Sequence, residues 1–456
     1  MKKLLFFMVA GLLWQCTCAQ PFIRHYWLDD FGKNYTLNRR VPGQHDPNHG
    51  YVLAASSQDA QIPSRDGYTD KRAIVIMKLH LDYSIEDSRV FKFDEISLYN
   101  FEIHDIFPWG GYYYLCGDMS FPNGTAAAIV GIVDTNLNNM QIHAYSEIKS
   151  FASIYVEQGC YYVCGETNSG EGVILENDYN RTMASRYLIE KPLYKIIAKN
   201  GGNDLYAVGT DGNEIVYLTI QTSSTPPGFL QPNVYKFQAP NTENVSITNY
   251  PGNRNGMIIS TAMGDSVYLY FFQDPNNYSH GYAFREPYGS PVFVKDVNCA
   301  FNKLALVGEY DDNGIGSACF FKCDLATGGL ITSSCYAQFP PLFTPNTLNP
   351  ISFKLYKVFH DITDSLFHAG GYCDYRNNST TFVGTPEEIW TNFEGTCANP
   401  FYIEVNPTMT ININPDNCFP FYCRIRTYEL EGQYKEYQTH NKCEQEIHNN
   451  GVTRNH

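Results

Sequence analysis

The chain has 456 residues and carries 32 basic and 47 acidic side chains, a net charge of −15. This acidic balance argues against nucleic acid or an anionic membrane surface as a partner. The length allows two or three average domains or one large all-β domain. Aromatic residues make up 15% of the chain, including 35 tyrosines, while charged residues reach only 17%. Such a composition favours strands, and it predicts an all-β protein.

The first predicted element is a secretory signal over residues 1–19. Two lysines precede an apolar run from Leu4 to Trp14, and small residues lead to a cleavage position after Ala19. Cys16 and Cys18 raise the alternative of a lipid-modified cysteine, although the residues before them fit such a site poorly. No later run reaches the roughly 18 apolar residues of a membrane-spanning helix. We therefore expect an exported chain that is secreted, periplasmic or held at the cell surface and does not span a membrane.

A repeat of about fifty residues follows the signal. Each of seven units contains a short apolar run that ends in a small residue, usually glycine. These runs occupy residues 51–56, 113–117, 161–165, 205–209, 257–261, 304–308 and 366–370. Another strand-like segment stands about ten residues before most of these runs, with a turn signal between, and two further strand-like segments follow. Four antiparallel strands in each unit, with a period of this size, predict a β-propeller.

The two ends of the repeat suggest how the ring closes. The seventh unit lacks an obvious fourth strand, whereas the segment Phe22–Leu28 is a strand-like run that precedes the first unit. We expect this segment to pair into the last unit and close a seven-bladed ring, with six or eight blades as alternatives. The propeller domain is expected to cover residues 20–400. Residues 401–456 form a C-terminal cysteine-containing appendage in this interpretation.

Over residues 22–400 the pattern resembles exported seven-bladed β-propeller proteins of the Gram-negative bacterial type. The resemblance implies an architecture and no activity, since propellers serve as enzymes, lectins and scaffolds. The chain has no nucleophile elbow, Walker loop, dinucleotide fingerprint or zinc-protease motif. Propeller enzymes draw single residues from several blades, so a missing motif leaves an enzyme possible.

In a four-stranded blade, the connections between the second and third strands share one face with those that lead to the next blade. Binding residues are expected on these loops because a rigid scaffold holds them. The candidates are Arg65, Asp66, Asp118, Glu166, Asp211, Glu309, Asp311, Asp374 and Arg376. The simpler interpretation is that acidic residues start turns and keep the loops hydrated. We expect no cofactor, with Ca²⁺ as an alternative at the acidic loop Tyr310–Gly316.

The predicted first strands place charged side chains near the propeller axis: His104, Lys195, Lys295, Asp296, Lys357 and His360. Several lysines in a channel suggest an anionic ligand, and solvated channel lining is the simpler alternative.

The cysteines are interpreted as packing or disulfide residues rather than metal ligands, because export favours oxidation. Cys319 and Cys335 fall opposite each other across a predicted hairpin, and we expect a disulfide between them if the register holds. Cys116 and Cys164 occupy equivalent, buried positions in neighbouring units. That spacing is too large for one shared metal or one disulfide.

The leading functional hypothesis is a monomeric binding protein that recognises a glycan or a protein partner on the loop-rich face. A glycoside hydrolase or lyase with carboxylates from several blades is the first alternative. A structural or assembly scaffold is the second.

Overall fold

The computed structural model describes most of the repeat region and little of the chain ends. The described residues are 23–26, 35–40, 50–59, 71–81, 85–92, 100–120, 125–138, 140–178, 185–200, 204–222, 231–285, 291–312, 315–325, 330–336, 350–361, 366–375, 379–384, 401–402, 433–434 and 444–447. The predicted signal over residues 1–19 lies outside them. No helix in the described part is long and apolar enough to cross a membrane.

Five sheets follow the chain in order, each an antiparallel set of four consecutive strands. The first contains β2 (Tyr35–Arg40), β3 (Gly50–Asp59), β4 (Lys71–Leu79) and β5 (Ile85–Lys92), and the second β6 (Asn100–Trp109), β7 (Tyr112–Ser120), β8 (Ala126–Asp134) and β9 (Met140–Tyr145). The third contains β10 (Ile148–Glu157), β11 (Cys160–Thr167), β12 (Gly172–Asp178) and β13 (Ser185–Ile189). The fourth contains β14 (Leu193–Ala198), β15 (Asp204–Thr210), β16 (Glu214–Gln221) and β17 (Gln231–Gln238), and the fifth β18 (Thr242–Asn249), β19 (Met257–Met263), β20 (Ser266–Asp274) and β21 (Asn277–Arg285).

Nine further strands form one larger sheet. It contains β22 (Val292–Ala300), β23 (Lys303–Asp312), β24 (Ile315–Asp324), β25 (Leu330–Tyr336), β26 (Pro350–Asp361), β27 (Leu366–Tyr375), β28 (Ser379–Gly384), β1 (Ile23–Tyr26) and β31 (Glu444–Ile447). A single parallel bridge, between Gly316 and Ser352, joins β24 to β26. Strand β1 pairs antiparallel with β28, which confirms the predicted pairing of the N-terminal segment with the last unit.

Short C-terminal strands extend three sheets at their edges. Strand β29 (Phe401–Tyr402) pairs with β21, β30 (Gln433–Tyr434) pairs with β5, and β31 pairs with β1. These are the described parts of the predicted appendage, whose cysteines lie outside the described residues.

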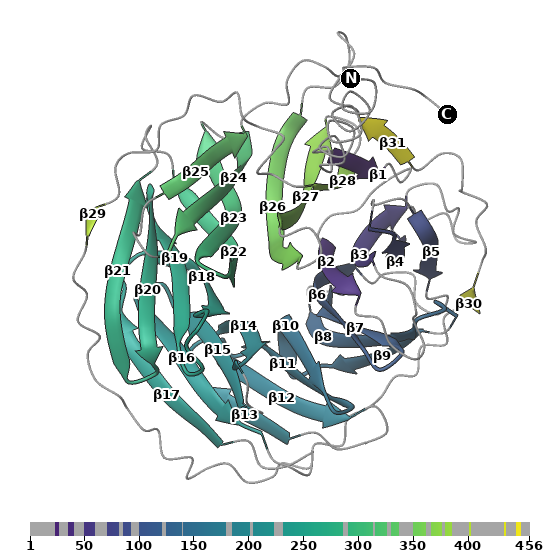
Figure 1. The fold of residues 1–456 in the computed structure, drawn as a ribbon. Helices are drawn as coiled ribbons and strands as arrows, with labels where there is room; N and C mark the ends of the chain where they lie inside the picture. The colour runs from purple at the N-terminus through teal and green to yellow at the C-terminus, as the bar shows by residue number, and fades with distance from the viewer. Residues whose placement is uncertain are drawn as a thin grey trace, which may run out of the picture.

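The sheets stand around a central opening in a propeller-like arrangement (Figure 1). The first strand of each set faces that opening, and each contacts the first strand of the next set, from β2 through β6, β10, β14, β18 and β22 to β26. Strand β26 in turn contacts β2. Side chains of different sheets are therefore brought together at the axis.

The repeated glycine has a specific structural cause. Gly117, Gly165, Gly209 and Gly308 each lie opposite a register shift in the first strand of their own sheet. A Cβ on Gly117 would lie 1.8 Å from the carbonyl oxygen of Glu102, and the other three positions are equally tight. The glycine thus allows a β-bulge to approach the second strand closely. The backbone that crowds the glycine therefore belongs to the first strand of the same sheet and its approach, rather than to a neighbouring sheet.

The core lies between neighbouring sheets. One cluster joins Tyr114 and Val130 of the β6–β9 sheet to Phe151 and Tyr161 of the β10–β13 sheet. The Tyr114 and Tyr161 rings lie 6.3 Å apart between centroids, and the Tyr145 and Tyr161 hydroxyls are hydrogen-bonded at 2.8 Å. Full burial of one aromatic side chain stabilises the fold by roughly 1.5–3 kcal/mol. The apolar runs of the sequence are therefore contacts between sheets.

Candidate functional site

Acidic residues gather near the ends of the second strands, one or two positions after the repeated glycines. We call this end of the sheets the loop face, marked by Asp118, Glu166, Asp211 and Glu309. Glu166 forms an ion pair with Lys149 at 2.9 Å, and Glu309 forms one with Lys295 at 3.3 Å. Each of these carboxylates therefore contacts a basic side chain of its own sheet.

Asp211 lies at a turn, where the simpler interpretation of the sequence expects acidic residues. Its carboxylate pairs with Lys191 and accepts backbone hydrogen bonds from Asn213 and Glu214, at 2.9 and 3.0 Å. Partial burial alone would raise the pKa of Asp211, but these donors outweigh burial and lower the pKa to about 2. Asp211 thus stabilises a turn.

The remaining predicted site residues are less fully described. Asp311 lies in β23 and Asp374 in β27, as register partners of Gly316 and Ser352. Arg65, Asp66 and Arg376 lie outside the described residues. Their roles stay predictions, as does Ca²⁺ binding at Tyr310–Gly316.

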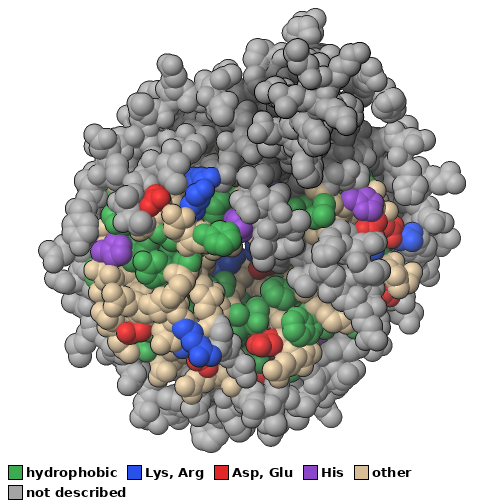
Figure 2. Space-filling view, in the orientation of Figure 1, with side chains coloured by type: hydrophobic (Ala, Val, Ile, Leu, Met, Phe, Trp, Pro, Cys, Tyr) green, Lys and Arg blue, Asp and Glu red, His purple; other side chains and the backbone are tan. Residues whose placement is uncertain are grey.

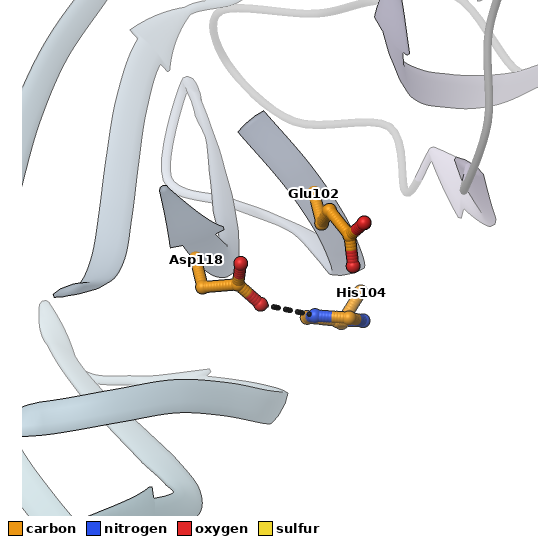
Figure 3. A group of neighbouring side chains, drawn as sticks. All are labelled: Glu102, His104 and Asp118. Atoms are coloured by element: carbon orange, nitrogen blue, oxygen red, sulfur yellow. Dashed lines mark hydrogen bonds and ion pairs between the residues drawn. The ribbon is translucent and has the colours of Figure 1, made fainter. Parts of the chain in front are cut away.

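The structure brings Asp118 together with two residues of the neighbouring strand β6. Figure 3 shows the carboxylates of Glu102 and Asp118 directed toward the ring of His104. Donor atoms of the three side chains all lie within 4.8 Å of one another, and His104 Nε2 lies 2.9 Å from Asp118 Oδ2. The Ser150 hydroxyl, from the next sheet, donates to the same Asp118 oxygen at 3.0 Å. Sequence reasoning named His104 and Asp118 separately and missed Glu102.

Glu102 was overlooked because only the register gives it importance. Glu102 and Asp118 are directly paired across β6 and β7. Like charges placed directly opposite in a sheet repel each other. The alternating spacing of Glu102 and His104 on one strand is the sequence signal that could have indicated a shared face.

A second group of charged residues lies deeper, at the axis. We call it the axial cluster: Asp105, Ser153, Lys195, Ser246, Asp296 and Lys357. Figure 2 shows basic and acidic side chains side by side at the centre of the ring. Five of the six residues, all except Ser246, directly follow the bulge of their strand.

Asp105 joins three sheets through its side-chain oxygens. It accepts hydrogen bonds from Lys357 Nζ at 2.7 Å, from the Ser153 hydroxyl at 2.8 Å and from the Ile154 amide at 3.3 Å. Burial would raise the pKa of Asp105, but the charges of Lys357 and Lys195 outweigh burial, and the pKa falls below its ordinary value.

Asp296 also joins several sheets through its side-chain oxygens. It accepts hydrogen bonds from Lys195 Nζ at 2.9 Å, from the Ser246 hydroxyl at 3.3 Å and from the Val358 amide at 3.1 Å. Both lysines of the axial cluster therefore have aspartate partners from other sheets. This pairing favours a structural role over the binding of an anion.

The two cysteines at equivalent positions of neighbouring units are buried. Cys116 and Cys164 are fully buried in different apolar clusters, and burial raises the pKa of both thiols. They are packing residues. Cys319 and Cys335 are register partners across β24 and β25, as expected, and the disulfide between them stays a prediction.

No family model and no curated protein matches this chain. Among solved structures, it is similar to the Dos1 propeller at 10% sequence identity and a TM-score of 0.45, over 80% of this chain and 95% of that one. It is also similar to the β-propeller domain of the Trilobed protease from Pyrococcus furiosus, which has an open velcro topology. That match has 10% identity and a TM-score of 0.40, over 80% of this chain and 95% of that one. Both are β-propellers, and the sheets of this chain have a propeller-like arrangement.

Proposed function

We propose that this chain is an exported, monomeric seven-bladed β-propeller that binds a glycan or a protein partner on its loop face. The proposed blade count divides the larger sheet at its single parallel bridge into two blades. Strand β1 then supplies the fourth strand of the last blade. The closed series of contacts among the first strands supports this count.

The observation that carries a binding role is a mixed patch formed by Lys149, Glu166 and Tyr194. Tyr194 is 38% exposed, and it stands at the bulge of β14 on the loop face. Burial raises the pKa of Tyr194, and the charge of Glu166 raises it further. Strand β14, which carries Tyr194, contacts strand β11, which carries Glu166. Glu166 is ion-paired with Lys149 of the same sheet. The patch thus combines an aromatic ring, a hydrogen-bond acceptor and a donor.

This combination favours a glycan among the two proposed ligands. A tyrosine ring offers an apolar face and a polar tip at low entropic cost. A carboxylate and an ammonium group beside it accept from and donate to hydroxyls. A few convergent polar groups around an apolar surface are the usual composition of a ligand site.

The test is a glycan array and partner capture with the exported chain, followed by affinity measurements on two variants. Tyr194→Ala is expected to weaken binding at least about tenfold, the equivalent of ~1.4 kcal/mol. Tyr112→Ala is the matched control, because Tyr112 is 37% exposed but begins β7 at the opposite end of the sheet. Equal loss in both variants, or no binding to any glycan or protein, would contradict the proposal.

The hydrolase alternative has one specific basis. Glu102 and Asp118 are a close carboxylate pair, with donor atoms within 4.8 Å. Retaining glycosidases hold their two carboxyl groups about 5–5.5 Å apart, and inverting ones about 6.5–9.5 Å. The pair is therefore closer than an inverting mechanism requires, and only retaining chemistry is worth assaying. Hydrolysis of aryl glycosides that disappears in Glu102→Gln would favour this alternative.

A further inference from the structure

We propose that Glu102, His104 and Asp118 bind a divalent transition-metal ion, with Zn²⁺ as the preferred ion. The inference does not depend on the proposed glycan or protein ligand, because all three donors belong to this chain and come from one pair of strands.

The donor set suits such an ion in type and in number. Imidazole nitrogen and carboxylate oxygens are typical zinc ligands, at about 2.0–2.2 Å from the ion. Two ligand atoms on a tetrahedral ion are then about 3.3 Å apart. The three donors already lie within 4.8 Å of one another, so small side-chain movements are enough to enclose an ion.

Electrostatics gives a second reason. Glu102 and Asp118 face each other across β6 and β7, where two negative charges repel. Within the described residues, the side chain of Glu102 has no hydrogen bond or ion pair. A divalent cation would neutralise both carboxylates at once. The His104 imidazole, by contrast, is hydrogen-bonded to Asp118 and not to Glu102.

The strongest argument is a comparison with the equivalent position on β22 and β23. Lys295 is the bulged residue there, as His104 is on β6, and both face the residue after a repeated glycine. Lys295 forms an ion pair with Glu309 at 3.3 Å, and Phe293 stands where β6 has Glu102. The same backbone thus carries an ordinary salt bridge in one sheet. In the other, histidine replaces the lysine and a second carboxylate replaces the aromatic ring.

The surroundings provide both access and orientation. The His104 side chain is 31% exposed, so an ion can enter from solvent. The hydroxyl of Ser150 orients Asp118, as the outer partners of metal ligands commonly do. Three protein ligands leave at least one coordination position for water or for a group of a bound ligand. The site therefore belongs to the open class of metal sites.

The test uses the exported chain, freed of metal with a chelator, and titration calorimetry with Zn²⁺, Mn²⁺ and Ca²⁺ in turn. We expect one Zn²⁺ per chain, tighter than the other two ions, and a rise in melting temperature that grows with Zn²⁺ concentration. Co²⁺ in place of Zn²⁺ is expected to show visible absorption typical of low coordination number.

The decisive variant is His104→Lys, which copies the Lys295–Glu309 arrangement and is expected to keep the fold, as checked by circular dichroism. Zinc binding is expected to be lost in this variant and in Glu102→Gln, whereas Glu309→Gln, the control on the equivalent sheet, keeps it. Binding that persists in His104→Lys, tighter binding of Ca²⁺ than of Zn²⁺, or no binding at all would each overturn the proposal. In the last case His104 serves only as a hydrogen-bond partner of Asp118.

Discussion

The charge pairs at the axis and those at the loop face use the same residue types but differ in their surroundings. At the axis, the Lys357 and Asp105 side chains are 16% and 6% exposed, and both contact strands of other sheets. At the loop face, Lys149 and Glu166 are 53% and 30% exposed and belong to one sheet. The comparison teaches that burial, rather than the presence of an ion pair, decides which pairs stabilise the ring.

The largest expected effect is on the axial side of this comparison. Asp105→Asn leaves the buried ammonium group of Lys357 without its ion-pair partner, a loss that typically costs about 3–5 kcal/mol. We expect a corresponding fall in the free energy of unfolding, measured by urea denaturation.

The control for this variant removes both charges. In the double variant Asp105→Asn with Lys357→Met no buried charge of the pair is left alone, so most of the lost stability is expected to return. A single variant as stable as the wild type would show that the axial pair does not support the ring.

An intermediate effect concerns pH. The pKa of Asp105 is lowered in the folded state, so its contribution to stability is fully present above the unfolded pKa of about 3.9 and is lost as pH falls through the folded pKa. Burial would lower the pKa of Lys357, but Asp105 and Asp296 raise it. Its contribution is present below the unfolded pKa of about 10.4 and is lost only at still higher pH.

The measurement is the unfolding free energy at a series of pH values. We expect little change from this pair between about pH 5 and pH 10, and a loss in acid. The acid loss is expected to be smaller in the double variant described above, which carries neither charge. An identical acid profile in both proteins would contradict the assignment to Asp105.

The smallest effect is expected at the loop face. Lys149→Ala removes an exposed ion pair, and such pairs contribute about 0–1 kcal/mol, less at high salt. Urea denaturation is expected to show almost no change, while affinity for the ligand falls if the patch around Tyr194 binds it. A stability loss as large as that of Asp105→Asn would abolish the distinction between the two regions.

The predictability of this fold from sequence follows from its repeat. The apolar runs that end in glycine could be recognised as second strands because their spacing and composition recur. The structure has strands at two of them, Tyr112–Ser120 and Cys160–Thr167. The pairing of the N-terminal segment could be predicted because the seventh unit lacked an obvious fourth strand. Residues 22–28 formed a strand-like run that belonged to no other unit. The bulge opposite each glycine was not anticipated, since glycine also suits a turn.

The site was predicted only in part, for a physical reason. Asp118, Glu166 and Glu309 follow a glycine at the end of a strand, so their place on the loop face could be read from position alone. Glu102 gains its role from exact cross-strand register, which an apolar pattern does not specify to one residue.

The sequence by itself determined most of the strands, their order and the face that carries the acidic residues, because apolar period and glycine positions are local properties. The tertiary structure alone decided which charges meet. Lys357 and Asp105 are 252 residues apart in the chain, and Lys195 and Asp296 are 101 apart. Such pairs form only when distant sheets converge on one axis, where low exposure strengthens the attraction and makes an unpaired charge costly.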